Sequence, residues 1–151
     1  MKKILLLLLI LTTLIGCGFK PIYSSNKSDI KIINIETGQN LLSKKFAKKL
    51  KTFSNGESNN QISIKLNIKK EKLIKAKSKK NIPTIFELHV NLILTITDQE
   101  NAQKTEELTI RTSYNNNDDK FELSRYERKI EEAALNQLFL DVIRFLSKNY
   151  K

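Results

Sequence analysis

The sequence predicts an α+β fold: a four-stranded, mostly antiparallel (mixed) sheet with two helices packed on one face, in the order β-α-β-β-β-α. Three observations lead to this class. Apolar residues recur every three to four positions in two segments, which is the period of a helix. They recur at every second position in three others, which is the period of a half-buried strand. A further segment rich in isoleucine precedes all five and favours a strand.

The first strand is expected over 29–36, DIKIINIE. Its apolar positions change parity between Ile32 and Ile33, which indicates a β-bulge or burial on both faces. Asn40 is a suitable N-cap for a helix over 41–53. The apolar stripe of this helix consists of Leu42, Phe46, Leu50 and Phe53. Its other face carries Lys44, Lys45, Lys48, Lys49 and Lys51. This basic face is interpreted either as a contact with anionic lipid or as the solvated side of a packed helix.

Alternation predicts the remaining three strands. The second begins at Gln61 and carries apolar side chains at Ile62, Ile64, Leu66 and Ile68. Residues 69–81 contain seven lysines and are expected to form a frayed extension and a loop. These lysines either prevent edge pairing between molecules or bind phosphate. The strands 84–97 and 105–114 flank a polar turn, so they are expected to form an antiparallel hairpin.

The last segment, 122–149, has a broad apolar stripe at helical spacing and is long enough to cover most of a small sheet. Glutamates in its first half and lysines at its end match the helix dipole. Both helices should pack on the sheet face that bears the even-numbered apolar residues, and the opposite face should stay polar.

Residues 1–16 predict a lipoprotein signal peptide that is cleaved. Two lysines precede about a dozen apolar residues, which suits a secretory signal and is too short for a membrane span. Leu14 to Cys17 resemble the bacterial lipobox, and this implies cleavage before Cys17, a diacylglycerol on its thiol and an N-acyl chain. An uncleaved signal anchor and a plain signal peptide with an incidental cysteine are the alternatives.

Removing this signal leaves the lipidated Cys17 and a linker over 17–28, followed by one domain over 29–151. The mature chain has 25 basic and 16 acidic residues, because Lys2 and Lys3 are removed. This positive net charge favours an anionic partner. Export excludes nucleic acid and leaves phospholipid, lipopolysaccharide or acidic protein. Gly18 stands where an aspartate would retain the lipoprotein in the inner membrane, so a lipid-anchored position in the outer membrane, facing the periplasm, is expected.

The sequence predicts a protein that is not an enzyme. Cys17 is the only cysteine and is used for lipidation, so no disulfide is possible. His89 is the only histidine, which excludes a multi-histidine metal site and leaves a catalytic triad without its partners. Carboxylates such as Asp118 and Asp119 have no spacing typical of acid and base roles. No cofactor is expected beyond the covalent acyl groups.

The residues 17–23, CGFKPIY, resemble the opening of alphaproteobacterial members of the LPS-assembly lipoprotein family LptE, formerly RlpB. Looser similarities follow in order: Thr97 and Asp98 at a strand end, RTSYN at 111–115, and a last helix that ends in DVIRFL. The resemblance implies a lipoprotein in the inner leaflet of the outer membrane, with two helices on a four-stranded sheet. It also implies that the protein sits inside the LptD β-barrel as plug and assembly factor and binds lipopolysaccharide.

Basic residues are the candidates for lipopolysaccharide contact. Charge placement alone selects Lys65, Lys69, Lys70, Lys72 and Arg111. Lys65, Lys69 and Arg111 share the parity of the polar sheet face. Two other functions remain open: a generic periplasm-facing lipoprotein adaptor of another lipid or envelope transport system, and an enzyme of the cell wall or of lipids. An associated barrel would favour the first reading, and an inner-membrane transporter would favour the adaptor.

Overall fold

The computed structural model describes residues 30–54 and 56–150. The predicted signal peptide 1–16, Cys17 and the linker up to 28 lie outside the described residues and stay predictions. Within these ranges six elements follow one another: β1 (Lys31–Thr37), α2 (Leu41–Phe53), β2 (Gln61–Lys77), β3 (Pro83–Thr97), β4 (Gln103–Asn115) and α3 (Lys120–Asn149). Neither of the two helices in the described ranges is long and apolar enough to cross a membrane.

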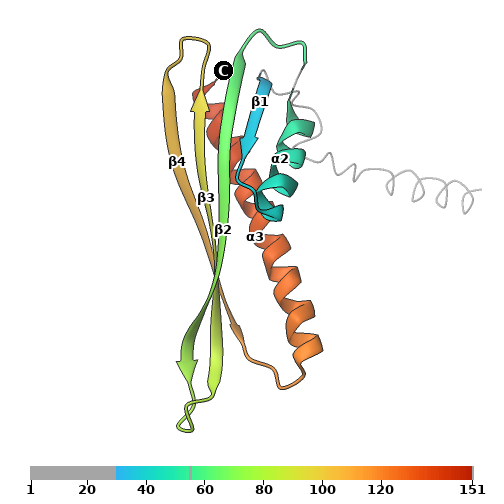
Figure 1. Ribbon diagram of the computed structural model, residues 1–151, viewed down its shortest axis with the longest axis vertical. Helices are drawn as coiled ribbons and strands as arrows, with labels where there is room; N and C mark the ends of the chain where they lie inside the picture. The colour runs from blue at the N-terminus through green and yellow to red at the C-terminus, as the bar shows by residue number, and fades with distance from the viewer. Residues whose placement is uncertain (1–29, 55, 151) are drawn as a thin grey trace, which may run out of the picture.

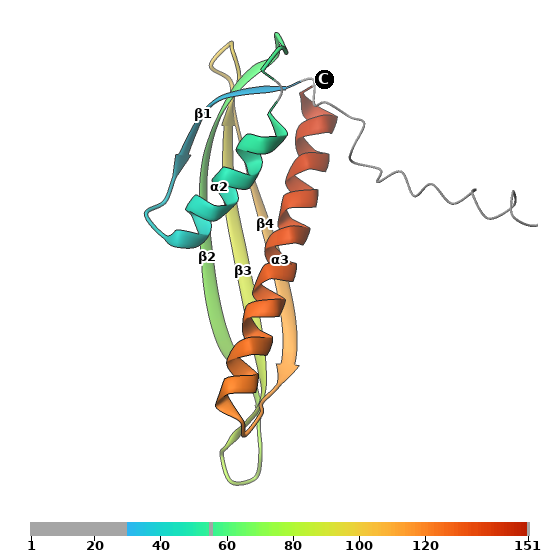
Figure 2. The same ribbon diagram turned by 90° about the vertical axis from the view of Figure 1, so that its right-hand side faces the viewer.

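The described strands form one mixed sheet in the order β1-β2-β3-β4. β1 runs parallel to β2, and the other neighbours are antiparallel. Both helices cover the same face of this sheet, with α3 lying along its length (Figures 1 and 2). The predicted fold class is therefore confirmed. The bulge in β1 is also confirmed, because the register shifts between Ile32 and Asn34 and leaves the side chain of Ile33 56% exposed.

The core lies between the sheet and the helices. Even-numbered side chains of β2 and β3 form its floor: Ile62, Ile64, Leu66, Ile68, Leu88, Val90, Leu92, Leu94 and Ile96. Residues at helical spacing in α3 form its roof: Leu123, Ile130, Ala134, Leu138, Val142 and Leu146. α2 adds Phe46 and Leu50. The single parity in the strands and the single stripe in each helix explain why one face of every element is buried.

One expectation was wrong: residues 69–77 are strand rather than a frayed extension and loop. β2 continues to Lys77 and pairs with β3 as far as Pro83, with register shifts near Ala76. The loop is confined to Ser78–Ile82, where Ser78 N donates to Ile82 O over 2.8 Å and Asn81 has a φ of 61°. Pairing with β3 gives the backbone N–H and C=O groups of this lysine-rich segment their hydrogen-bond partners, so the segment forms a strand without burying its side chains.

The first turn of α2 supplies hydrogen-bond partners to the backbone of β2 beyond the end of β1. Asn40 accepts from Ser43 N over 2.8 Å as the N-cap, and its Nδ2 donates to Ile68 O over 2.9 Å. The hydroxyl of Ser43 accepts from Ile68 N over 2.8 Å, and Ser43 is fully buried. Ile68 thus has partners for both backbone groups although β1 ends at Thr37.

Ser43→Ala is expected to lower the free energy of unfolding by about 1–3 kcal/mol, because the buried amide of Ile68 then loses its acceptor. Chemical denaturation followed by circular dichroism measures this change. Ser147→Ala is the control, since Ser147 lies on the exposed side of α3. Equal stability of the two variants would contradict the role assigned to Ser43.

Candidate functional site

The sheet face that points away from the helices is called the open face, and it carries the odd-numbered side chains of β2, β3 and β4. Lys65, Lys69 and Arg111 lie on it, as the sequence parity predicts. Lys65 lies beside Thr95, Lys69 beside Asn91, and Arg111 beside His89 in the strand register. Within the described part of the chain, none of these three cations has an ion pair or a side-chain hydrogen bond. Their charges are available to a ligand or a partner.

A shallow depression of about 370 Å³ lies on the open face between Lys69 and Arg111. The rest of its lining consists of Glu71, His89, Asn91, Ile93, Glu107 and Thr109. Asn91 Nδ2 donates to Glu107 Oε1 over 2.5 Å, while its buried Oδ1 has no hydrogen-bond partner among the described residues. The depression therefore combines two cationic groups, Lys69 and Arg111, which can bind a phosphate, with the two carboxylates of Glu71 and Glu107.

Next to this depression, Glu87 is held by three donors. Its Oε1 accepts from Lys75 Nζ over 2.7 Å and from Ser113 Oγ over 2.9 Å, and its Oε2 lies 2.7 Å from His89 Nε2. These hydrogen bonds, from Lys75, His89 and Ser113 in that order, lower the pKa of Glu87 from 4.5 to about 2. Glu87 thus neutralises Lys75 and fixes the ring of His89 at the rim of the depression.

Glu87→Gln is expected to reduce the decrease in the free energy of unfolding between pH 5 and 2. The carboxylate contributes stability above its unfolded pKa of 4.5, and this is lost as the pH falls toward the folded value of about 2. Unfolding midpoints in urea between pH 5 and 2 check this expectation. Glu132→Gln is the comparison for removing a charge without an ion-pair partner in the described chain. Acid profiles of Glu87→Gln and wild type that coincide would contradict the expectation.

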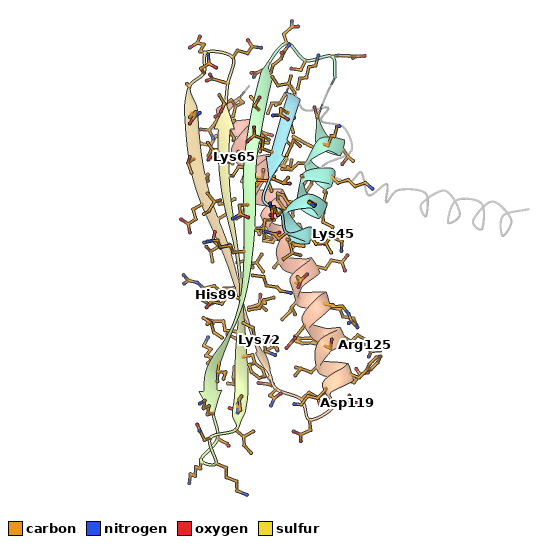
Figure 3. The ribbon with its side chains drawn as sticks, viewed as in Figure 1. Lys45, Lys65, Lys72, His89, Asp119 and Arg125 are labelled. Atoms are coloured by element: carbon orange, nitrogen blue, oxygen red, sulfur yellow. The ribbon has the colours of Figure 1, made fainter. Side chains whose placement is uncertain are left out.

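Lys70 and Lys72 lie on the other side of β2, toward α3. Lys70 Nζ pairs with Glu131 and Lys72 Nζ with Glu127, each over 2.5 Å. Figure 3 shows Lys72 on the side of the sheet that α3 covers. The structure therefore separates the five predicted basic residues into three on the open face and two that link β2 to α3. The carboxylates of Glu131 and Glu127 on α3 already bind the ammonium groups of Lys70 and Lys72.

Lys72 belongs to a cluster that ties the sheet to the first half of α3. Its Nζ lies 4.0 Å from the ring centroid of Phe86, and Tyr114 donates its hydroxyl to Glu127 Oε1 over 2.8 Å. Burial, together with the hydrogen bond to Glu127, raises the pKa of Tyr114 well above its usual range. Burial alone raises the pKa of Glu127, but the hydrogen bonds from Lys72 and Tyr114 outweigh it and lower that pKa. The contacts of this cluster stabilise the packing of α3 against the sheet.

The hairpin end of β2 and β3 extends beyond the start of α3 (Figures 1 and 2). Leu73, Ile74 and Ile82 are 37%, 51% and 55% exposed there. Lys77, Lys79 and Lys80 surround the turn and are also exposed. Sequence reasoning did not select these apolar residues, because an expected loop has no face on which an exposed side chain can be recognised. The hairpin end offers apolar and cationic groups together.

The described residues hold no group of three or more histidine, cysteine, aspartate or glutamate side chains that could bind a metal ion. Glu107 and Glu87 on the open face are engaged by amide, ammonium and hydroxyl donors. The ammonium group of Lys69 and the guanidinium group of Arg111 are the groups of the depression that suit the binding of an anionic molecule.

No protein-family model matches the sequence, and a comparison with curated proteins found no match either. Solved structures do match. Rare lipoprotein B from Shewanella oneidensis shares 10% identity at a TM-score of 0.60, over 76% of this chain and 94% of that one. The chain has the rare lipoprotein B fold. A minor lipoprotein from Acinetobacter baumannii (15% identity, TM-score 0.60, 79% and 92% covered) and lipoprotein B from Nitrosomonas europaea (18%, 0.59, 79% and 85%) also share it.

These identities are low, so the agreement lies in the order of the elements and their packing. The shared fold agrees with the fold that the family resemblance in the sequence implies. It carries no residue roles to this chain. The alphaproteobacterial type, the lipidation of Cys17 and the contacts of Lys65, Lys69 and Arg111 stay predictions.

Proposed function

We propose that this protein is an outer-membrane lipoprotein that partners an LptD-type β-barrel as plug and assembly factor in lipopolysaccharide transport. The rare lipoprotein B fold is the observation that carries the proposal, because proteins of that name are lipoproteins and the former RlpB is LptE. The lipobox before Cys17 and the CGFKPIY segment support it independently of the fold. A lipid-anchored place in the inner leaflet, facing the periplasm, belongs to the same proposal.

The surface chemistry agrees with a place inside a barrel. The lumen of a large membrane barrel is lined by polar side chains, so a protein that fills it needs a polar surface of its own. The open face supplies this with threonines, amides and charged groups, while the apolar side chains of β2 and β3 are covered by α2 and α3. The long, narrow body in Figures 1 and 2 also suits such a lumen.

Lipopolysaccharide binding is the second half of the proposal. Its phosphorylated sugars present the anionic groups that Lys69 and Arg111 can bind. Lys65 adds a further charge on the same face. Lys70 and Lys72 belong to the predicted set as well, but a ligand would have to compete with Glu131 and Glu127 for them.

Crosslinking followed by affinity purification tests the partnership. The chain with residues 1–151 and a tag after Lys151 is produced in cells of a Gram-negative host that depends on it, and its crosslinked membrane partner is identified by mass spectrometry. A large outer-membrane barrel is expected, and the chain should fractionate with the outer membrane. An inner-membrane transporter as the partner would overturn the proposal in favour of a generic lipoprotein adaptor.

Depletion gives a second, independent result. Loss of the protein is expected to lower the amount of surface lipopolysaccharide and to leave the barrel misassembled. Normal surface lipopolysaccharide together with a correctly assembled barrel would contradict the proposed function.

A further inference from the structure

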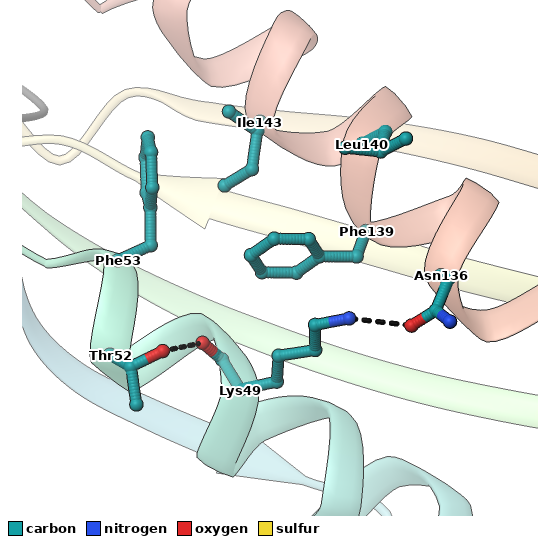
Figure 4. A pocket seen from close by; sticks show the side chains of 7 residues that line it. All are labelled: Lys49, Thr52, Phe53, Asn136, Phe139, Leu140 and Ile143. Carbon is teal, nitrogen blue, oxygen red and sulfur yellow. Dashed lines mark hydrogen bonds between the residues drawn. The ribbon is translucent and has the colours of Figure 1, made fainter. Parts of the chain in front are cut away.

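A groove of about 530 Å³ lies between the end of α2 and the second half of α3 (Figure 4). Phe53, Phe139, Leu140 and Ile143 form its apolar walls. At one end Lys49 Nζ donates to Asn136 Oδ1 over 2.6 Å and lies 4.5 Å from the ring centroid of Phe139. The size and apolar character are those of a binding site for a few large side chains.

The described chain begins next to this groove. Ile32 N donates to Ser54 Oγ over 2.8 Å, and Ser54 directly follows Phe53 at the groove wall. The start of β1 and the C-terminal end of α3 also lie at the same end of the molecule (Figures 1 and 2). The first described residue, Ile30, therefore lies two residues before a strand position that is hydrogen-bonded next to the groove wall.

The segment that precedes Ile30 has the composition to fill it. Residues 18–23, GFKPIY, contain Phe19, Ile22 and Tyr23, and 24–29 (SSNKSD) join them to the domain. The seven residue steps from Tyr23 to Ile30 can span up to about 25 Å when extended. Pro21 favours an extended backbone in the residue before it, which lowers the entropy lost when such a segment binds. Apolar side chains are thus tethered within reach of an apolar groove.

We propose that the segment 18–23 docks into the groove between α2 and α3 of its own chain. Aromatic side chains of the segment pack against Phe53 and Phe139, and the remaining wall is provided by Leu140 and Ile143. The inference requires neither a barrel partner nor lipopolysaccharide. Its failure would therefore leave the proposed function untouched, and the reverse also holds.

Docking has a consequence for the predicted anchor at Cys17. With the segment free, thirteen residue steps separate Cys17 from Ile30, a reach of about 45 Å. With the segment docked, its first residue, Gly18, directly follows the anchor, and Phe19 is the first apolar side chain of the bound residues. The end of the domain that holds the α3 C-terminus is then held at the membrane surface, and the hairpin loop Ser78–Ile82 points away from it.

Photocrosslinking in the full chain tests the proposal. A benzophenone amino acid replaces Asn136 at the groove, and in a matched variant it replaces Arg125, which is exposed about three turns earlier on α3. After irradiation in the native membrane, crosslinked peptides are mapped by mass spectrometry. Position 136 is expected to crosslink to residues 18–23 of the same chain at least about ten times more than position 125. Crosslinks from 136 to a lipid, to another protein or to no part of 18–23 would overturn it.

A thermal measurement checks the same contact without a probe. Replacing Phe19, Ile22 and Tyr23 with serine should lower the unfolding midpoint of the lipidated chain by at least about 4 °C, because three apolar side chains lose their buried site. Ser24→Ala with Ser25→Ala is the control in the adjoining linker. A midpoint that the triple serine variant leaves unchanged would also overturn the proposal.

Discussion

Leu138→Ala is expected to lower the free energy of unfolding by about 2–5 kcal/mol. Leu138 is 0% exposed and lies in the middle of the α3 stripe that covers the sheet. Removing its branched end leaves a cavity, because α3 is fixed on both sides by other buried residues of the same core. A domain of this size has only about 5–15 kcal/mol in total, so this one change can remove a large part of it.

Leu41→Ala is the matched control, because it is the same chemical change at a leucine that is 73% exposed. Its effect should stay within about 0.5 kcal/mol. Urea denaturation followed by far-ultraviolet circular dichroism measures both variants. Equal losses at the two positions would show that α3 does not provide the roof of the core.

Periodicity predicted the architecture because every element buries only one face. In β3, buried Leu92 and Leu94 alternate with side chains on the open face, and the pattern remains legible over the whole strand. The parity change in β1 indicated the bulge, since one extra residue moves the following side chains to the other face. These signals are local, and a single sequence contains them.

The extension of β2 could not be predicted in this way. Residues 69–77 carry lysines on both faces, so alternation disappears from the sequence there. The segment is nevertheless a strand, because β3 satisfies its backbone and because Glu127 and Glu131 on α3 pair with its lysines. Those partners lie far away in sequence, and tertiary contacts override the weak local preference.

The candidate site could also be predicted only in part, because local patterns do not contain contacts between distant segments. Strand parity placed Lys65 and Arg111 on one face correctly, whereas a segment expected to be a loop assigns no face to Lys72. The depression itself depends on the register between strands: it forms where β2, β3 and β4 bring Lys69, Asn91 and Thr109 into one row. Register across three strands cannot be read from the spacing within each of them.

Reversing the charge of the three open-face cations is expected to weaken lipopolysaccharide binding by about tenfold or more. The variant Lys65→Glu, Lys69→Glu, Arg111→Glu replaces attraction for phosphate with repulsion at three positions, and exposed ion pairs contribute about 0.2–1 kcal/mol each. These side chains have no ion pair or hydrogen bond in the described chain whose loss would cost stability, and circular dichroism checks that the variant keeps its fold, since Lys65 lies opposite Glu36 in the strand register. Binding of purified lipopolysaccharide at 0.15 M salt measures the effect.

The control carries the same change in net charge on α2: Lys44→Glu, Lys45→Glu, Lys48→Glu. These lysines are exposed, and the helix they belong to covers the opposite face of the sheet. If binding depends on the geometry of the open face, the α2 variant loses little, because charges farther away than about 8 Å are largely screened at this salt concentration. Equal losses in both variants would mean that net charge alone attracts the ligand, and a larger loss in the α2 variant would move the anionic lipid contact to its basic face.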